Sequence, residues 1–206
     1  VRLFPRRYEK QLFDLFADSA HLIVAGAEAL ARSLGEDPEE RPRLAAQLHE
    51  HSADALALSR RISNRLAEAL ITPFEAEVLH AMSLAMSDVL DAMERTADLV
   101  VRFRLGSIPL PLLETAELIT RAAELTVEAA WHLGDVDELR EYRAAMRRLD
   151  THAERLMRGE LVDLYASAAP AGEMMQVREV TFELRRVLER FEVVARSADL
   201  LRIKDS

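Results

Sequence analysis

The sequence has no cysteine and few of the residues that interrupt helices or build sheets. Without cysteine the chain can form no disulfide, no thiolate metal site and no thiol nucleophile, which fits a reducing cytoplasm. Only 6 glycines and 7 prolines occur in 206 residues, and aromatic residues make up 5%. Alanine, leucine, glutamate and arginine are abundant instead, as in long helices. The composition therefore predicts an all-α protein.

The sequence also lacks long uncharged stretches and an excess of basic residues. Its uncharged runs are far shorter than the ~20 apolar residues that cross a bilayer. Its first residues lack the apolar core of a secretion signal. A net charge of -9 argues against binding to nucleic acid or to an anionic membrane surface. We therefore expect a soluble cytoplasmic protein with no transmembrane segment.

Apolar residues recur at intervals of three and four along six stretches, which is the period of a helix. The predicted helices cover about residues 6–34, 43–70, 72–104, 112–133, 136–167 and 172–203. Thr72, Pro73 and Glu75 predict a helix start, as N-cap, first helical residue and reciprocal cap. Residues 105–111 contain one glycine and two prolines, which predict a hinge.

Two segments of the chain occur twice, in the same order and at nearly the same offset. Residues 88–100 carry acids, an arginine and apolar positions that recur in residues 189–201. Residues 50–56 recur in the same way in residues 150–156. Such repetition indicates a duplicated unit.

We therefore predict two repeated antiparallel three-helix bundles within one compact domain. The first half is residues 1–104 and the second half is residues 105–206. Short connections make consecutive helices antiparallel neighbours, so the two halves should superpose on each other.

The repeated segments place acids one turn apart on single faces of their helices. Counting from the connecting turns puts the acids of consecutive helices at the same level, so the two stripes can face each other across one groove. Like charges at this spacing repel each other, and a bound cation would offset the repulsion. The ten candidate metal ligands are Glu50, Asp54, Asp91, Glu94 and Asp98 in the first half, and Asp150, Glu154, Glu189, Glu192 and Asp199 in the second half.

Carboxylates without thiolates select hard or borderline cations. We expect a divalent or trivalent ion, namely iron, manganese, magnesium or zinc. His51 and His152 lie beside the acids, but isolated helical histidines are usually surface residues, so neither is included as a ligand. The second half has Ala195 where the first has Glu94, and we therefore expect the first half to bind metal better.

Arg95 and Arg196 occupy equivalent places in the two repeats. We expect each of them to pair with an acid on the neighbouring helix and so to limit the negative charge of its groove.

Three interpretations of the acids remain open. They could hold metal for regulation, they could hold magnesium in an all-helical phosphohydrolase, or they could be solvated faces of a metal-free helical adaptor. The sequence contains no glycine-rich phosphate loop and no Ser/His/Asp or Cys/His set, so we expect no enzyme. A homo-oligomer is compatible with the sequence.

Residues 94–98, Glu-Arg-Thr-Ala-Asp, resemble the Glu-Arg-Ile-Gly-Asp signature of the PhoU family of phosphate-uptake regulators. Residues 71–75, with the Asp-Val-Leu-Asp of residues 88–91, resemble the PhoU-like accessory proteins of phosphate transporters. The resemblance extends over essentially the whole chain. It implies two three-helix bundles whose acid-x-x-x-Asp motifs can hold multinuclear metal clusters.

The resemblance also implies a partner, a Pit-type inorganic phosphate transporter, whose transport the accessory protein modulates at the inner face of the cell membrane. Two departures from the family pattern stand out. Ala195 breaks the second acid-x-x-x-Asp motif, and residues 75–78 read Glu-Ala-Glu-Val where the accessory proteins usually read Asp-Arg-Glu-Asp.

Overall fold

The computed structural model describes residues 6–68, 73–133 and 135–205. These residues form helices joined by short turns, with no strand among them, which confirms the all-α prediction. The helices are α1 (Arg6–Gly35), α2 (Arg41–Ala67), α3 (Pro73–Phe103), α4 (Leu110–Trp131), α5 (Val136–Ala166) and α6 (Ala171–Asp205).

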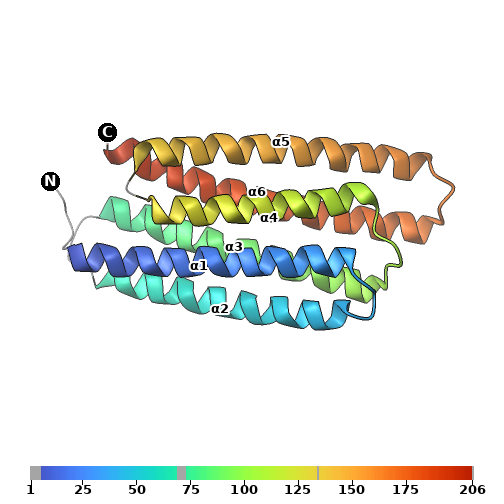
Figure 1. The fold of residues 1–206 in the computed structure, drawn as a ribbon, viewed down its shortest axis with the longest axis horizontal. Coiled ribbons are helices and arrows are strands. Elements are labelled where there is room, and N and C mark those ends of the chain that lie inside the picture. The colour runs from blue at the N-terminus through green and yellow to red at the C-terminus, as the bar shows by residue number, and fades with distance from the viewer. Residues whose placement is uncertain (1–5, 69–72, 134, 206) are drawn as a thin grey trace.

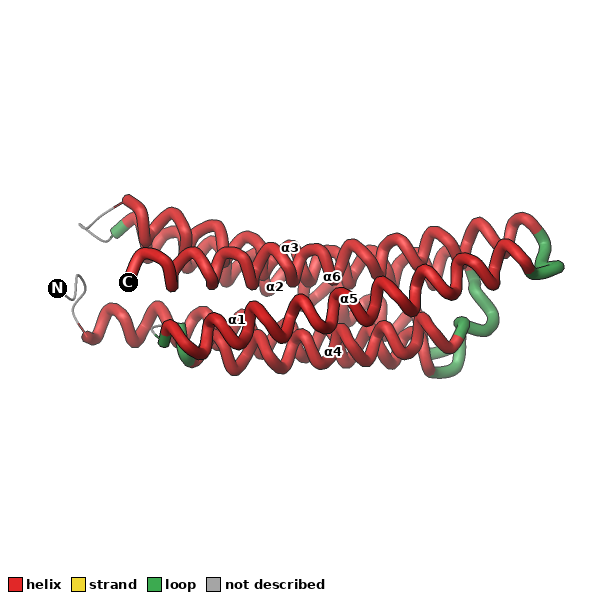
Figure 2. The backbone as a smooth tube through the Cα atoms, turned by 90° about the horizontal axis from the view of Figure 1, so that it is seen from above, coloured by secondary structure: helices red, strands yellow, loops and turns green. Residues whose placement is uncertain are grey.

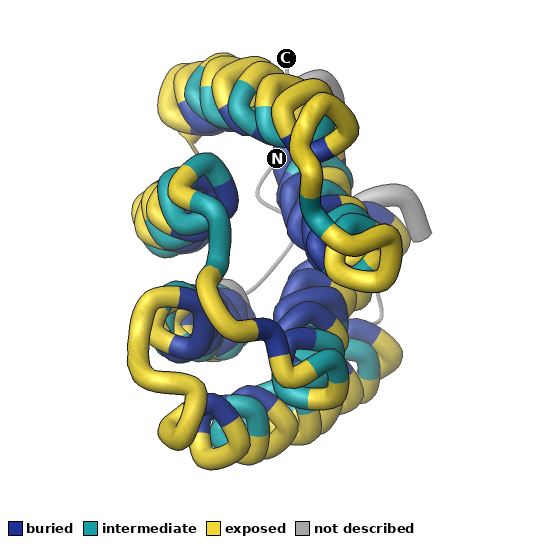
Figure 3. Tube along the Cα trace, turned by 90° about the vertical axis from the view of Figure 1, so that its right-hand side faces the viewer, coloured by how far each residue is buried: buried dark blue, intermediate teal, exposed yellow. Residues whose placement is uncertain are grey.

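Consecutive helices run antiparallel and form an elongated bundle (Figures 1 and 2). Its middle consists of α1, α3, α4 and α6, with each of these helices packed against two of the others. α2 packs against α1 and α3 on one side, and α5 packs against α4 and α6 on the other (Figure 3). The two halves of the chain therefore meet along α1–α4 and α3–α6.

One continuous apolar core runs through all six helices. Phe16 of α1, Leu90 of α3 and Phe191 of α6 are among its fully buried side chains. In the end-on view the buried residues face the interior of the bundle (Figure 3). Because α3 and α6 pack against each other more extensively than any other pair, the halves form one body. That they superpose as repeats stays a prediction.

The connection between the halves lies where the sequence predicts it. α3 ends at Phe103, and Arg104 adopts a positive φ of 51°. The amide of Leu105 donates to the carbonyl of Val100 at 3.4 Å, which closes a Schellman motif around the arginine. α4 begins at Leu110, inside the predicted hinge, because a proline is accepted in the first helical turn.

Arg41, the first residue of α2, fixes this connection. Its side chain is buried and donates to the carbonyls of Leu105 and Gly106, the latter at 3.0 Å. The predicted Thr72 cap lies outside the described residues. At the start of α5 the Asp135 side chain accepts from the amides of Asp137 and Glu138 at 3.0 and 3.3 Å.

Gly26 permits the close approach of α1 to α3. A Cβ atom at this position would clash with Cδ2 of the buried Leu90. Among the described residues, no helix combines the length and the hydropathy needed to span a membrane.

Candidate functional site

Three side-chain contacts fix the register between α2 and α3. Ser63 bonds to His80 at 3.0 Å, Ser59 to Ser83 at 3.3 Å, and His49 Nδ1 lies 2.6 Å from Glu94 Oε1. From one contact to the next, the residue number falls along α2 and rises along α3 by nearly the same amount, as expected for two antiparallel helices. This register places the acids at positions 50 and 54 level with those at 91 and 94, as the residue count predicts.

The rotation of α2 differs from the expectation. His49, Ser59 and Ser63 all contact α3, and at ~100° per residue they fall within one sector of about 80° on α2. Asp54 is five residues from both His49 and Ser59, so it is rotated away by roughly 140°. The prediction that the acids of α2 face those of α3 across one groove is therefore wrong for Asp54.

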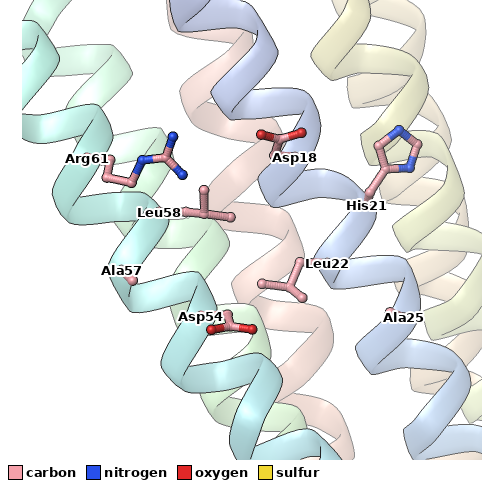
Figure 4. A pocket seen from close by; sticks show the side chains of 8 residues that line it. All are labelled: Asp18, His21, Leu22, Ala25, Asp54, Ala57, Leu58 and Arg61. Atoms are coloured by element: carbon pink, nitrogen blue, oxygen red, sulfur yellow. The ribbon is translucent and has the colours of Figure 1, made fainter.

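Asp54 instead lines a groove of about 530 Å³ between α1 and α2. Asp18 and His21 of α1 and Arg61 of α2 lie around the same groove (Figure 4). Glu50, one turn before Asp54, is exposed. The groove thus combines two carboxylates with a guanidinium, while the ring of His21 turns toward α4 and packs against Trp131.

The acids of α3 have partners close by. Glu94 contacts His49, and Asp98 accepts from Arg102 on its own helix at 2.5 Å. Arg95 donates to Asp91, one turn away. In the second half, Arg196 donates to the backbone carbonyl of Glu192 at 3.3 Å.

The expectation that Arg95 and Arg196 pair with acids on neighbouring helices is therefore wrong. Both use a partner four residues earlier on the same helix, which for Arg95 is the side chain of Asp91 and for Arg196 is the backbone carbonyl of Glu192.

In the second half, two other arginines pair α5 with α6. Arg143 of α5 contacts Glu192 of α6 at 2.5 Å, and both side chains are largely buried. Arg185 of α6 lies 3.3 Å from Glu189, 3.9 Å from Asp150 and 3.9 Å from Glu154. We call Asp150, Glu154, Glu189 and Glu192 the second acidic cluster.

Asp150 is the member of the second acidic cluster whose titration the surroundings change. Burial raises the pKa of Asp150, and the charges of Glu192, Glu154 and Glu189 raise it further, against the opposing effect of Arg185. Asp150 Oδ1 and Glu192 Oε1 are buried without a hydrogen-bond partner. Asp199 lies further along α6. It is half-buried and interacts with another group.

In the first half, the contact between α2 and α3 is more exposed to solvent. The hydrogen bond with Glu94, together with the charge of that carboxylate, raises the pKa of His49 above its ordinary value. Sequence reasoning considered His51, left it out of the ligand set and passed over His49, because only the packing of α2 on α3 distinguishes the two histidines.

The described side chains do not form a ready metal site. No three histidine, aspartate or glutamate side chains among them gather closely enough to hold an ion. The acids of α3 are tied to Arg95, Arg102 and His49, and those of the second acidic cluster to Arg143, Arg158 and Arg185. As arranged, neither half fits the metal cluster that the resemblance implies.

A smaller groove of about 210 Å³ lies between α5 and α6, next to the second acidic cluster. Met157, Leu161 and Phe182 give it an apolar lining, and Arg158 and Arg185 border it. Arg178 stacks over the ring of Phe182, 4.6 Å from its centre.

No family model matches the sequence. A protein of Rhizobium meliloti (strain 1021) that carries the name pit accessory protein is 28% identical over 203 residues, which cover 94% of this chain and 92% of the relative.

Solved structures share the fold. A PhoU-like protein from Shewanella oneidensis MR-1 has a TM-score of 0.74 at 17% identity, over 97% of this chain and 100% of that one. PhoU from Pseudomonas aeruginosa has a TM-score of 0.67 at 13% identity, over 97% and 99% of the two chains. The resemblance predicted from the sequence is thereby confirmed: the fold is PhoU-like, and the sequence is similar over nearly its whole length to a pit accessory protein.

Proposed function

We propose that this protein is an accessory protein of inorganic phosphate transport that modulates a Pit-type transporter from the cytoplasmic face of the membrane. The observation that carries the proposal is the similarity to the pit accessory protein of Rhizobium meliloti, which extends over nearly the full length of both chains. A whole-length match favours a shared role over the reuse of one helical segment.

The geometry supports regulation in preference to catalysis. The exposed acids and arginines of the two halves neutralise one another in pairs, and the grooves beside them are open to solvent. A long rigid bundle with charged sides is suited to binding another protein along its length.

The test is phosphate uptake by cells that contain one Pit-type transporter, with and without this chain. We expect the chain to change the rate of ³³P-phosphate uptake and to co-purify with the transporter in mild detergent. Uptake through an unrelated phosphate carrier serves as the control and should not change. Equal uptake with and without the chain, or nucleotide hydrolysis by the purified protein, would contradict the proposal.

Metal binding is a separate proposal, and it rests on the repeated acids of the sequence. We propose that the first half takes up one divalent or trivalent ion through Asp91, Glu94 and Asp98, the predicted ligands of this half that lie on α3. Uptake requires these side chains to exchange their arginine and histidine partners for the ion. Metal analysis of the purified protein after incubation with iron, manganese, magnesium or zinc tests it.

A further inference from the structure

Arg185 lies among acids that the sequence marks as metal ligands. Its guanidinium is within 3.9 Å of carboxylate oxygens from both helices, with Asp150 and Glu154 on α5 and Glu189 on α6. We propose that this guanidinium is a built-in cation that takes the place of a metal ion, so that the second acidic cluster binds none.

Most of the negative charge around Arg185 is offset without an added ion, because three guanidiniums face four carboxylates. Glu192 is bound by Arg143 at 2.5 Å and Glu154 by Arg158 at 2.6 Å, while Glu189 and Asp150 share Arg185. A guanidinium stays protonated under all physiological conditions. A metal ion entering the second acidic cluster would therefore meet permanent positive charges, and the half-buried setting screens their repulsion poorly.

The first half has a different arrangement. Its arginines, Arg95 and Arg102, pair along their own helix and are mostly exposed. The contact from α2 to the acids of α3 is the imidazole of His49, and imidazole nitrogen is a common metal ligand. The duplicated halves thus differ in the side chain that meets the acids, with a guanidinium, which donates only, in one and an imidazole in the other.

Two buried carboxylate oxygens of the second acidic cluster, Asp150 Oδ1 and Glu192 Oε1, have no hydrogen-bond partner, although Arg185 and Arg143 offset part of their charge. Once the Arg185 guanidinium is removed, Asp150, Glu154 and Glu189 are free to turn toward a cation and to supply an all-oxygen ligand set. The inference concerns α5 and α6 alone and does not depend on a role in phosphate transport.

The test measures Mn²⁺ bound to the purified full chain by equilibrium dialysis, together with the melting temperature. Arg185→Gln removes the charge and keeps a polar side chain of similar reach. We expect Arg185→Gln to bind about one more Mn²⁺ per chain than the unaltered protein, and to melt higher as Mn²⁺ is added. Adding Asp150→Asn to Arg185→Gln should abolish both gains.

Arg158→Gln is the matched control, because Arg158 also bonds to Glu154 but is exposed and lies at the rim. It removes the same charge and should add no Mn²⁺. In the otherwise unaltered protein, Asp150→Asn should leave the bound Mn²⁺ unchanged, and this measurement decides the matter even if Arg185→Gln fails to fold. Loss of Mn²⁺ in that single variant, or no gain in folded Arg185→Gln, would overturn the proposal.

Discussion

Asp88 of α3 and Arg190 of α6 form an ion pair between the two halves, with Oδ2 3.6 Å from Nη1. Both side chains are about half exposed, so water and salt screen the attraction. The apolar contact between α3 and α6 beside this pair removes much more surface from water. The two halves are therefore held together by their shared core, and the ion pair adds little.

This leads to a prediction for two adjacent residues. Arg190→Ala should cost less than about 1 kcal/mol, the usual range of an exposed pair. Phe191→Ala, next to it on α6, should cost about 3–5 kcal/mol, because Phe191 is buried and its removal leaves a cavity. Urea unfolding of each variant measures the free energies. Similar costs at the two positions would mean that charge, and not the core, joins the halves.

Arg104 offers a stabilising substitution. Its φ of 51° is strained for any residue with a Cβ atom, and glycine adopts it without that cost. Arg104→Gly should raise the free energy of unfolding by roughly 0.5–1 kcal/mol.

Arg102→Gly, two residues earlier, provides the comparison. It introduces glycine into the last turn of α3 and removes the ion pair with Asp98, so it should lower stability by about 1 kcal/mol. Thermal melts test whether stability rises in Arg104→Gly and falls in Arg102→Gly. A lower melting temperature in both variants would show that the backbone of Arg104 is not strained.

Two helical glycines should respond differently to alanine. Gly159 lies within α5 with no atom close to its missing Cβ, so Gly159→Ala should add roughly 0.5–1 kcal/mol through helix propensity. Gly26→Ala would gain the same propensity, but its Cβ would displace the buried Leu90 side chain, at a cost of about 1–3 kcal/mol. We expect melting to rise for Gly159→Ala and to fall for Gly26→Ala. A rise in both would show that α1 and α3 can move apart freely.

The pH dependence of His49 can be measured by NMR in protein treated with EDTA. Its hydrogen bond with Glu94 should keep the pKa above the ordinary 6.5, and Glu94→Gln should return it toward that value. Because the folded pKa is the higher one, the pair stabilises the fold fully below pH 6.5, and this stabilisation is lost as the pH rises through the folded pKa. An unchanged His49 pKa in Glu94→Gln would show that the contact is absent in solution.

The asymmetry of the two halves predicts unequal effects on metal-dependent melting. A metal ion that binds only the folded chain stabilises it by ~2.7 kcal/mol at a hundredfold excess over Kd. Asp98→Asn should remove most of this shift, and Asp199→Asn should remove less. Equal effects, or no shift in the unaltered protein, would show that the acids are solvated surface.

The sequence by itself determined the helices and the level of the acids along them. The predicted helix at 136–167 agrees to within one residue with α5, Val136–Ala166. The agreement is close because the apolar period and the helix-breaking residues act within a few turns of the chain. The same local arithmetic placed the acids at 50 and 54 level with those at 91 and 94, since each residue adds a fixed rise.

Only the tertiary structure decided which side of each helix meets which neighbour. One residue turns a helix by ~100°, so the rotation of α2 about its own axis decides that His49 meets Glu94 and that Asp54 lies in the groove with α1. Arg143 and Arg185 reach across from α5 and α6, where packing brings the long side chains next to buried acids. The local sequence fixes the rise and the period of each helix. The partner of a long, flexible side chain depends on segments distant in sequence, and these meet only when the core closes.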